Sequence, residues 1–263
     1  MLEERKKTFN NFAGKYEKYR PDYPAEMYDD LVKYSALKKD DSLLEIGCGT
    51  GKATEGFLQR GFERITCIEY GDNLAEFTRD KFSSFKSLEV LNEDFEKWQG
   101  EKDHYSLIYC ATAFHFLNPE IAYTKMHEML KENGTVAIFW NMSMNNGNII
   151  YEKIKEAHLK IATDISSYPG KTHENSLNKL IEERCDEINK TQFYKGLEYV
   201  IYKREIIHTA DDYIELISTH SPVAVLKPEA RKMLLCEIKR NIEENGGIFR
   251  ENMITTCYFM QKK

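Results

Sequence analysis

The fold is decided by residues 43–51, Leu43-Leu44-Glu45-Ile46-Gly47-Cys48-Gly49-Thr50-Gly51, where an apolar run carries an acid and three glycines then alternate with small residues. Residues 52–58 read as the start of a helix. A strand, a tight glycine turn and a helix N-terminus in succession form a ligand-binding corner of an α/β sheet. We therefore expect an α/β fold in which this corner binds a small molecule.

The remaining strands are expected from apolar runs that alternate with helical patterns. Such strands favour a parallel sheet covered by helices on both faces. The last run has the alternation of an antiparallel strand near a sheet edge. Together with the corner, these runs predict a doubly wound, mostly parallel sheet of seven strands. The runs lie at 64–70, 88–91, 105–111, 135–141, 197–208 and 249–260.

We expect a single domain made of consecutive segments. These are an N-terminal lid segment and helix at 1–35, a ligand-binding core at 36–141, a helical cap inserted at 142–191, and a C-terminal part at 192–263 that completes the sheet. Within the cap, two helices are expected around Ser166–Lys171. The aromatic N-terminal segment, with Phe9 and Phe12 at helix-like spacing, either packs on the domain or closes over a ligand.

Composition and charge disfavour several classes of function. The chain has 263 residues and a formal charge of −6, which gives no support to a basic nucleic-acid-binding face. The sequence contains no run of about 20 apolar residues, the length that a membrane span needs. The charged N-terminus lacks the apolar core of a secretory signal, so we expect a cytoplasmic protein. The six scattered cysteines lack metal-ligand spacing, and we expect no metal site.

The spacing of the glycines narrows the choice of ligand. Lys52 stands where a dinucleotide-binding G-x-G-x-x-G loop has its third glycine. Glu45, two residues before Gly47, would repel a pyrophosphate but suits a ligand with an ammonium group. Glu69 ends the next strand about 20 residues beyond the glycines, the separation expected for a carboxylate that binds ribose. The pattern therefore indicates a zwitterionic ligand with a nucleoside at one end.

This combination resembles the class I S-adenosylmethionine-dependent methyltransferases. The resemblance implies S-adenosylmethionine as cofactor, with the glycines at its methionine part, Glu45 orienting the ammonium through the loop, and Glu69 on the ribose. It also implies that Asp94 meets the adenine amino group, that Phe95 packs on the ring, and that residues 111–115 face the substrate. The implied cofactor-binding set is Glu45, Gly47, Gly49, Gly51, Glu69, Tyr70, Asp94, Phe95 and Ala111.

The stretches 19–24, 113–116 and 139–141 resemble the small-molecule branch that includes trans-aconitate methyltransferase-like proteins. The resemblance implies a small-molecule acceptor, such as a carboxylate or a hydroxyl, and Tyr19, Arg20, His115 and Trp140 are its candidate binding residues. His115 is also the candidate catalytic residue, because its unperturbed pKa lies near neutrality. A carboxylate acceptor needs no general base, so His115 could equally line the pocket. Arg20 could clamp a carboxylate or pair with a surface acid.

Simpler readings and two other functions fit the same residues. Asp94 could cap a helix that begins at Phe95, and Glu69 could be a solvated strand end. An NAD-dependent oxidoreductase shares the strand, the glycine turn and the ribose acid, although Lys52 disfavours it. A non-catalytic, S-adenosylmethionine-binding regulatory protein would carry the same corner. The sequence indicates neither the acceptor nor the oligomeric state.

Overall fold

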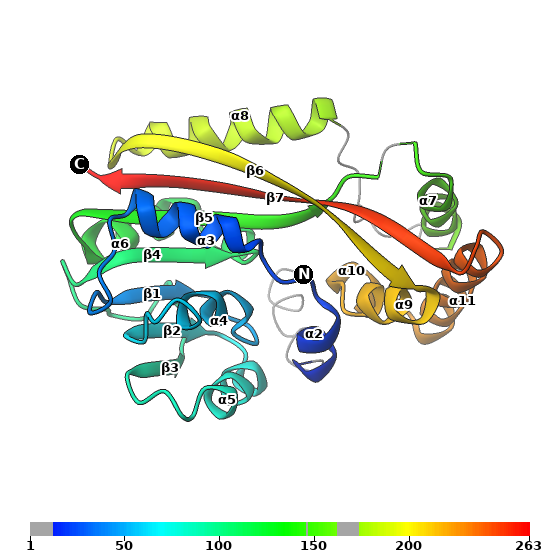
Figure 1. Cartoon of the computed structure of the whole chain (residues 1–263), viewed down its shortest axis with the longest axis horizontal. Helices are drawn as coiled ribbons and strands as arrows, with labels where there is room; N and C mark the ends of the chain where they lie inside the picture. The colour runs from blue at the N-terminus through cyan, green and yellow to red at the C-terminus, as the bar shows by residue number, and fades with distance from the viewer. Residues whose placement is uncertain (1–12, 146, 162–173) are drawn as a thin grey trace. The chain divides into compact units, whose positions relative to one another are not determined.

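The computed structural model describes residues 13–145, 147–161 and 174–263. One seven-stranded sheet has the order β3-β2-β1-β4-β5-β7-β6 (Figure 1). The pairs β1–β2, β2–β3, β1–β4 and β4–β5 are parallel, whereas β7 points opposite to β4 in Figure 1. The predicted fold class is confirmed. The strands are β1 (Leu43–Ile46), β2 (Ile65–Glu69), β3 (Leu88–Asn92), β4 (Tyr105–Ala111), β5 (Leu130–Ser143), β6 (Tyr194–Thr209) and β7 (Ile248–Lys262).

Helices follow most of the strands, as an α/β fold requires. They are α2 (Ala13–Tyr19), α3 (Ala25–Tyr34), α4 (Lys52–Leu58), α5 (Asp72–Lys81), α6 (Pro119–Met129), α7 (Ile149–Ile161), α8 (Glu174–Thr191), α9 (Ala210–Ser218), α10 (Ser221–Ala224) and α11 (Pro228–Glu243), with a 3-10 turn at Phe114–Phe116. Among the described residues, no helix has the length and apolar character needed to cross a membrane.

The described chain divides into two compact units. The sheet unit comprises residues 22–141, 180–202 and 255–263, and the helical unit takes the rest of the described chain. The expected cap at 142–191 is divided between the units after Lys179. The turn expected at Ser166–Lys171, together with Phe9 and Phe12, lies outside the described residues.

Each unit has its own apolar core. In the sheet unit, β1 is buried along its whole length, and its Leu43 side chain joins a cluster that includes Phe57, Tyr109 and Phe139. A strand buried on both faces is what a contiguous apolar run predicts for a parallel sheet. In the helical unit, Ile154, Leu234 and other residues of α7, α9 and α11 form a second cluster.

One predicted boundary is wrong. The strand expected at 135–141 begins earlier, because α6 ends at Met129 and β5 starts at Leu130. Leu130 pairs with Tyr105, and the register shifts before Leu107 pairs with Thr135. Asn133, within this irregularity, has a φ of +58°. The left-handed Asn133 therefore lies inside a strand irregularity and does not end a helix.

Candidate functional site

The glycine loop connects β1 to α4 in the sheet unit. Gly47, Gly49 and Gly51 have φ values of +70°, +58° and +77°, a region that glycine adopts without steric cost. The Gly49 N–H donates to Glu69 Oε2 at 2.8 Å, and the Gly49 carbonyl accepts from the Thr78 hydroxyl at 2.7 Å. A Cβ at Gly49 would meet no described heavy atom within 4 Å. The loop is thus fixed in place while one face of its backbone stays open.

Glu69, the last residue of β2, ties this loop to the next one. Its Oε2 accepts from Gly49, and its Oε1 accepts from the Gly71 N–H at 2.8 Å. Burial raises the pKa of the Glu69 carboxyl, although the backbone N–H groups of Gly71, Gly49 and Tyr70 oppose the change. Asn92, which ends β3, donates to the Glu69 and Tyr70 carbonyls at 3.0 and 3.1 Å. The ends of neighbouring strands are therefore linked, and Glu69 is a buried strand end rather than a solvated one.

Glu45 lies behind the loop, in the core. Its Oε2 atom accepts from the Thr54 hydroxyl of α4 at 2.5 Å, and only 1% of the residue is exposed. Burial raises the pKa of Glu45 to about 8, and the nearby Glu69 charge adds to the effect. Glu45 therefore braces β1 against α4.

Asp94 follows β3 and organises a turn. Its Oδ1 accepts from the Glu96 N–H at 3.1 Å, and its Oδ2 lies 3.1 Å from the exposed Lys97 ammonium. Asp94 was also predicted to cap a helix beginning at Phe95. It does accept a hydrogen bond from the following backbone, but a turn and not a helix follows it. Phe95 is buried, with the Lys125 ammonium 5.2 Å from its ring centre.

The end of β4 contains a contact that the sequence did not predict. Ala111 pairs with Phe139 of β5. The next residue, Thr112, has a φ of +55°, which is unusual for a β-branched residue and is a form of strain that clusters at functional sites. The Thr112 hydroxyl is hydrogen-bonded to the Tyr23 hydroxyl at 2.8 Å. Tyr23 lies in the stretch 19–24, which resembles the small-molecule branch. That resemblance is the sequence signal that could have pointed to Tyr23.

Two of the predicted acceptor residues meet in the sheet unit. The indole N–H of Trp140 donates to Nδ1 of His115 at 3.4 Å. The Arg184 guanidinium of α8 lies 5.1 Å from the Trp140 ring and 5.2 Å from the Phe114 ring. Arg184 was missed, because no periodic pattern connects a residue of α8 with β5.

The other two predicted acceptor residues, Tyr19 and Arg20, belong to the helical unit. Tyr19 packs against the second apolar cluster. Arg20 donates from Nε to the Thr219 hydroxyl at 2.9 Å and from Nη2 to the Thr219 carbonyl at 3.1 Å. A threonine therefore binds the guanidinium that was predicted to clamp an acceptor. The acceptor role of Tyr19 and Arg20 stays a prediction.

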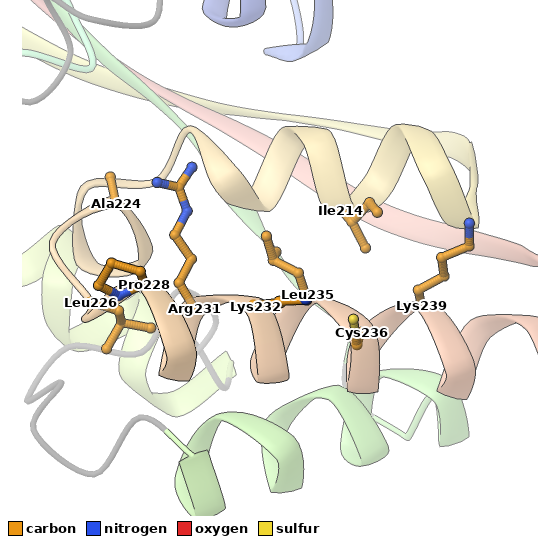
Figure 2. Close-up of a pocket in the computed structure, with 9 residues that line it drawn as sticks. All are labelled: Ile214, Ala224, Leu226, Pro228, Arg231, Lys232, Leu235, Cys236 and Lys239. Atoms are coloured by element: carbon orange, nitrogen blue, oxygen red, sulfur yellow. The ribbon is translucent and has the colours of Figure 1, made fainter.

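The helical unit also contains an open groove of 490 Å³, across which side chains of α9 and α11 face each other (Figure 2). One of its basic residues, Lys239, is paired with Asp211 at 2.6 Å. The groove is lined by Ile214, Ala224, Leu226, Pro228, Arg231, Lys232, Leu235, Cys236 and Lys239.

Residues 13–145, 147–161 and 174–263 hold no cluster of three or more His, Cys, Asp or Glu side chains suited to a metal ion.

Comparisons with known proteins agree with the predicted resemblance. The profile of a family described as "Methyltransferase domain" matches residues 43–134, from the start of β1 into β5. An uncharacterised methyltransferase of Schizosaccharomyces pombe is 25% identical over 266 residues, which cover 97% of this chain and 97% of the relative. These matches favour a methyltransferase over the NAD-dependent oxidoreductase.

Solved structures share the fold at low sequence identity. A proposed type II methyltransferase of Anaeromyxobacter dehalogenans superposes with a TM-score of 0.64 at 14% identity, covering 93% of this chain and 98% of that one. A phosphoethanolamine N-methyltransferase of Haemonchus contortus, in complex with S-adenosylhomocysteine, gives a TM-score of 0.57 at 12% identity over 96% of this chain and 57% of that one. At such identities the likeness shows the architecture.

Proposed function

We propose that the chain is a class I S-adenosylmethionine-dependent methyltransferase, as its matches favour, in which Gly49, Glu69 and Asp94 hold the cofactor while a small-molecule acceptor receives the methyl group. The observation that carries the proposal is the open backbone face at Gly49, held in place by the Glu69 carboxylate. When bound, S-adenosylmethionine supplies a methyl group already activated on a sulfonium sulfur.

We assign the ribose to Glu69. Its carboxylate oxygens accept the backbone N–H groups of Gly49 and Gly71, and the Tyr70 N–H is a third backbone donor to the same carboxylate. A carboxylate has about four lone-pair sites, so a site remains for a hydrogen bond from a ribose hydroxyl. Tyr70, which directly follows Glu69 and is 38% exposed, would cover the sugar.

We assign the adenine to Asp94 and Phe95. The Oδ2 atom of Asp94 is paired with Lys97, whose side chain is 84% exposed, and such a surface pair contributes about 0–1 kcal/mol. The adenine amino group can therefore take the place of Lys97 at little cost. The buried Phe95 ring supplies an apolar wall beside it.

The methionine part would lie along Gly47, Gly49 and Gly51. Glu45 would act on the methionine part indirectly, because its hydrogen bond with Thr54 fixes the first turn of α4 behind the loop. The acceptor would lie at Ala111–His115 and Trp140, and in-line displacement depends mainly on this positioning.

The cofactor assignment is tested by calorimetric titration of the full chain with S-adenosylhomocysteine. We expect Glu69→Ala to weaken binding at least 100-fold, because it removes the ribose acceptor and releases the Gly49 N–H. Glu55→Ala is the matched control, since Glu55 is a partly exposed acid of α4 paired with Lys81. Its affinity should stay within about threefold of that of the wild type. An unchanged affinity for Glu69→Ala would contradict the ribose assignment.

Two further measurements separate the alternatives. NAD in the same calorimeter should give no binding heat, whereas the oxidoreductase alternative requires it. A screen of acids, phenols, alcohols and amines with methyl-labelled cofactor distinguishes an enzyme from a regulatory binding protein. Tight S-adenosylhomocysteine binding without transfer to any of these acceptors would favour the regulatory protein.

A further inference from the structure

Lys125 of α6 contacts the turn that is proposed to hold the adenine. Its ammonium donates to the Glu96 carbonyl at 3.2 Å and also to the Trp98 carbonyl. The same ammonium lies 5.2 Å from the centre of the Phe95 ring. One side chain thus contacts three of the residues that follow Asp94, and all of these residues belong to the sheet unit.

A second contact from the start of α6 fixes this turn at Glu96. The backbone N–H of Asn118, the residue that caps α6, donates to Glu96 Oε1 at 2.8 Å. The Glu96 N–H in turn donates to Asp94 Oδ1 at 3.1 Å. Glu96 is therefore held by Asn118 and Lys125, and it orients the Asp94 carboxylate. Because Oδ1 is fixed in this way, α6 also sets the direction of Oδ2, the atom proposed to accept from the adenine.

Lys125 also supplies a positive charge near the Asp94 carboxylate. Burial lowers the pKa of Lys125, and the Asp94 charge is the largest of the charges that oppose this change. Lys97, the mostly exposed partner of Oδ2, would leave that atom when the adenine amino group binds. Lys125 is held by backbone carbonyls of the turn and would stay. Since a carboxylate shielded from water keeps its charge more easily beside a cation, Lys125 can keep Asp94 ionised.

We propose that Lys125 is a positioning residue that makes the cofactor site selective for adenine over other bases. It holds the turn that directs Asp94 Oδ2, and it balances the carboxylate charge once Lys97 has left. The inference rests on the proposed assignment of the adenine to Asp94. Hypoxanthine has a carbonyl oxygen where adenine has its amino group. A carboxylate and a carbonyl both only accept hydrogen bonds, so this base should bind more weakly.

The test measures binding of S-adenosylhomocysteine and S-inosylhomocysteine to the full chain by calorimetric titration. The wild type should prefer the adenine ligand roughly 10- to 100-fold, the range for one hydrogen bond to a charged group. Lys125→Met should lower this ratio of Kd values roughly fivefold or more, because the carboxylate loses its direction and its counter-charge. Lys125→Gln keeps N–H donors for the turn carbonyls but no charge, so its ratio should be intermediate. Lys125→Gln decides the test if urea unfolding shows that Lys125→Met does not fold.

Two control variants set the limits of the ratio. Lys39 also lies over a phenylalanine, 4.2 Å from the ring centre of Phe62, and donates to the Arg60 carbonyl in the same unit. Lys39→Met should therefore keep the wild-type ratio. Asp94→Asn should bring the ratio close to one, because an amide can accept from an amino group or donate to a carbonyl.

The inference is overturned if Asp94→Asn loses the preference for adenine while a folded Lys125→Met keeps it. Equal weakening of both ligands in Lys125→Met leaves the ratio unchanged and would likewise reduce Lys125 to a support of the fold. A failure of the proposed function looks different, because the wild type itself would then bind neither ligand or would not distinguish them, and the inference would fall with it.

Discussion

A carboxyl group buried in the core makes stability depend on pH, and Glu45 is such a group. Its pKa of about 8 in the folded protein stands above the usual 4.3 or so of the unfolded chain. Between these values the folded protein keeps a proton that the unfolded chain has released. The stability linked to Glu45 is therefore fully present below about pH 4 and is lost as pH rises toward 8, by about 1.4 kcal/mol per pH unit.

We expect Glu45→Gln to remove this loss. A glutamine has the same shape, can accept from the Thr54 hydroxyl, and has no proton to release. Urea unfolding of the cofactor-free protein at pH 5, 6, 7 and 8 should show the variant gaining stability relative to the wild type as pH rises. Glu55→Gln, at a partly exposed position, should run parallel to the wild type. Parallel curves for Glu45→Gln would mean that the buried carboxyl ionises at its ordinary pKa.

At the scale of elements, Gly47 is the point where the glycine loop meets the segment after β4. A Cβ at Gly47 would lie 2.6 Å from the Cβ of Ala113, and the φ of +70° is unfavourable for any L side chain. We expect Gly47→Ala to destabilise the protein by about 1–3 kcal/mol and to weaken binding of S-adenosylhomocysteine. Urea unfolding and calorimetry measure the two effects.

The contact with Ala113 and the positive φ of Gly47 both contribute to the expected loss of stability, and a second variant separates them. Ala113→Gly removes the clashing methyl group but leaves the backbone strain. The double variant Gly47→Ala/Ala113→Gly should therefore recover part of the lost stability relative to Gly47→Ala alone. No recovery would show that the φ of Gly47, and not the contact with Ala113, sets the cost.

The elements that could be predicted from the sequence are those marked by a pattern in neighbouring residues. Strands β1 to β4 are contiguous apolar runs, and Glu69 could be paired with the glycine loop from the spacing of a βαβ unit alone. The boundary at Leu130 could not be found in this way. Residues 130–134 contain polar side chains and Asn133-Gly134, a pattern that fits a helix stop, and only the pairing of Leu130 with Tyr105 makes them strand.

The acceptor-binding residues were harder to predict from the sequence than the cofactor-binding ones. His115, which follows β4, and Trp140, which lies in β5, were both predicted as acceptor-binding residues. The structure brings the two side chains into contact. Arg184 reaches them from α8, whose own residues carry no motif. Arg20 was the predicted candidate for clamping a carboxylate, yet its guanidinium is bonded to Thr219. Such long-range pairings are decided by packing, which a single sequence does not record.

At the scale of the whole molecule, the two cores indicate two levels of local stability. The residues proposed to bind the cofactor all lie in the sheet unit, whereas α9 and α11 bury the separate cluster of the helical unit. A unit with its own core can open without global unfolding. A ligand protects only those amides whose exposure requires its release.

We therefore expect S-adenosylhomocysteine to change hydrogen exchange unevenly. At 100 times its Kd the ligand adds about 2.7 kcal/mol, so amides of peptides covering 43–51 and 65–71 should exchange roughly 100-fold more slowly. Peptides of α9 and α11 should change much less, because the helical unit can open while the sheet unit keeps its ligand. Mass spectrometry of the full chain with and without S-adenosylhomocysteine measures both sets together. Equal slowing in both sets would mean that the helical unit opens only when the whole molecule unfolds, and the two cores would then form one cooperative unit.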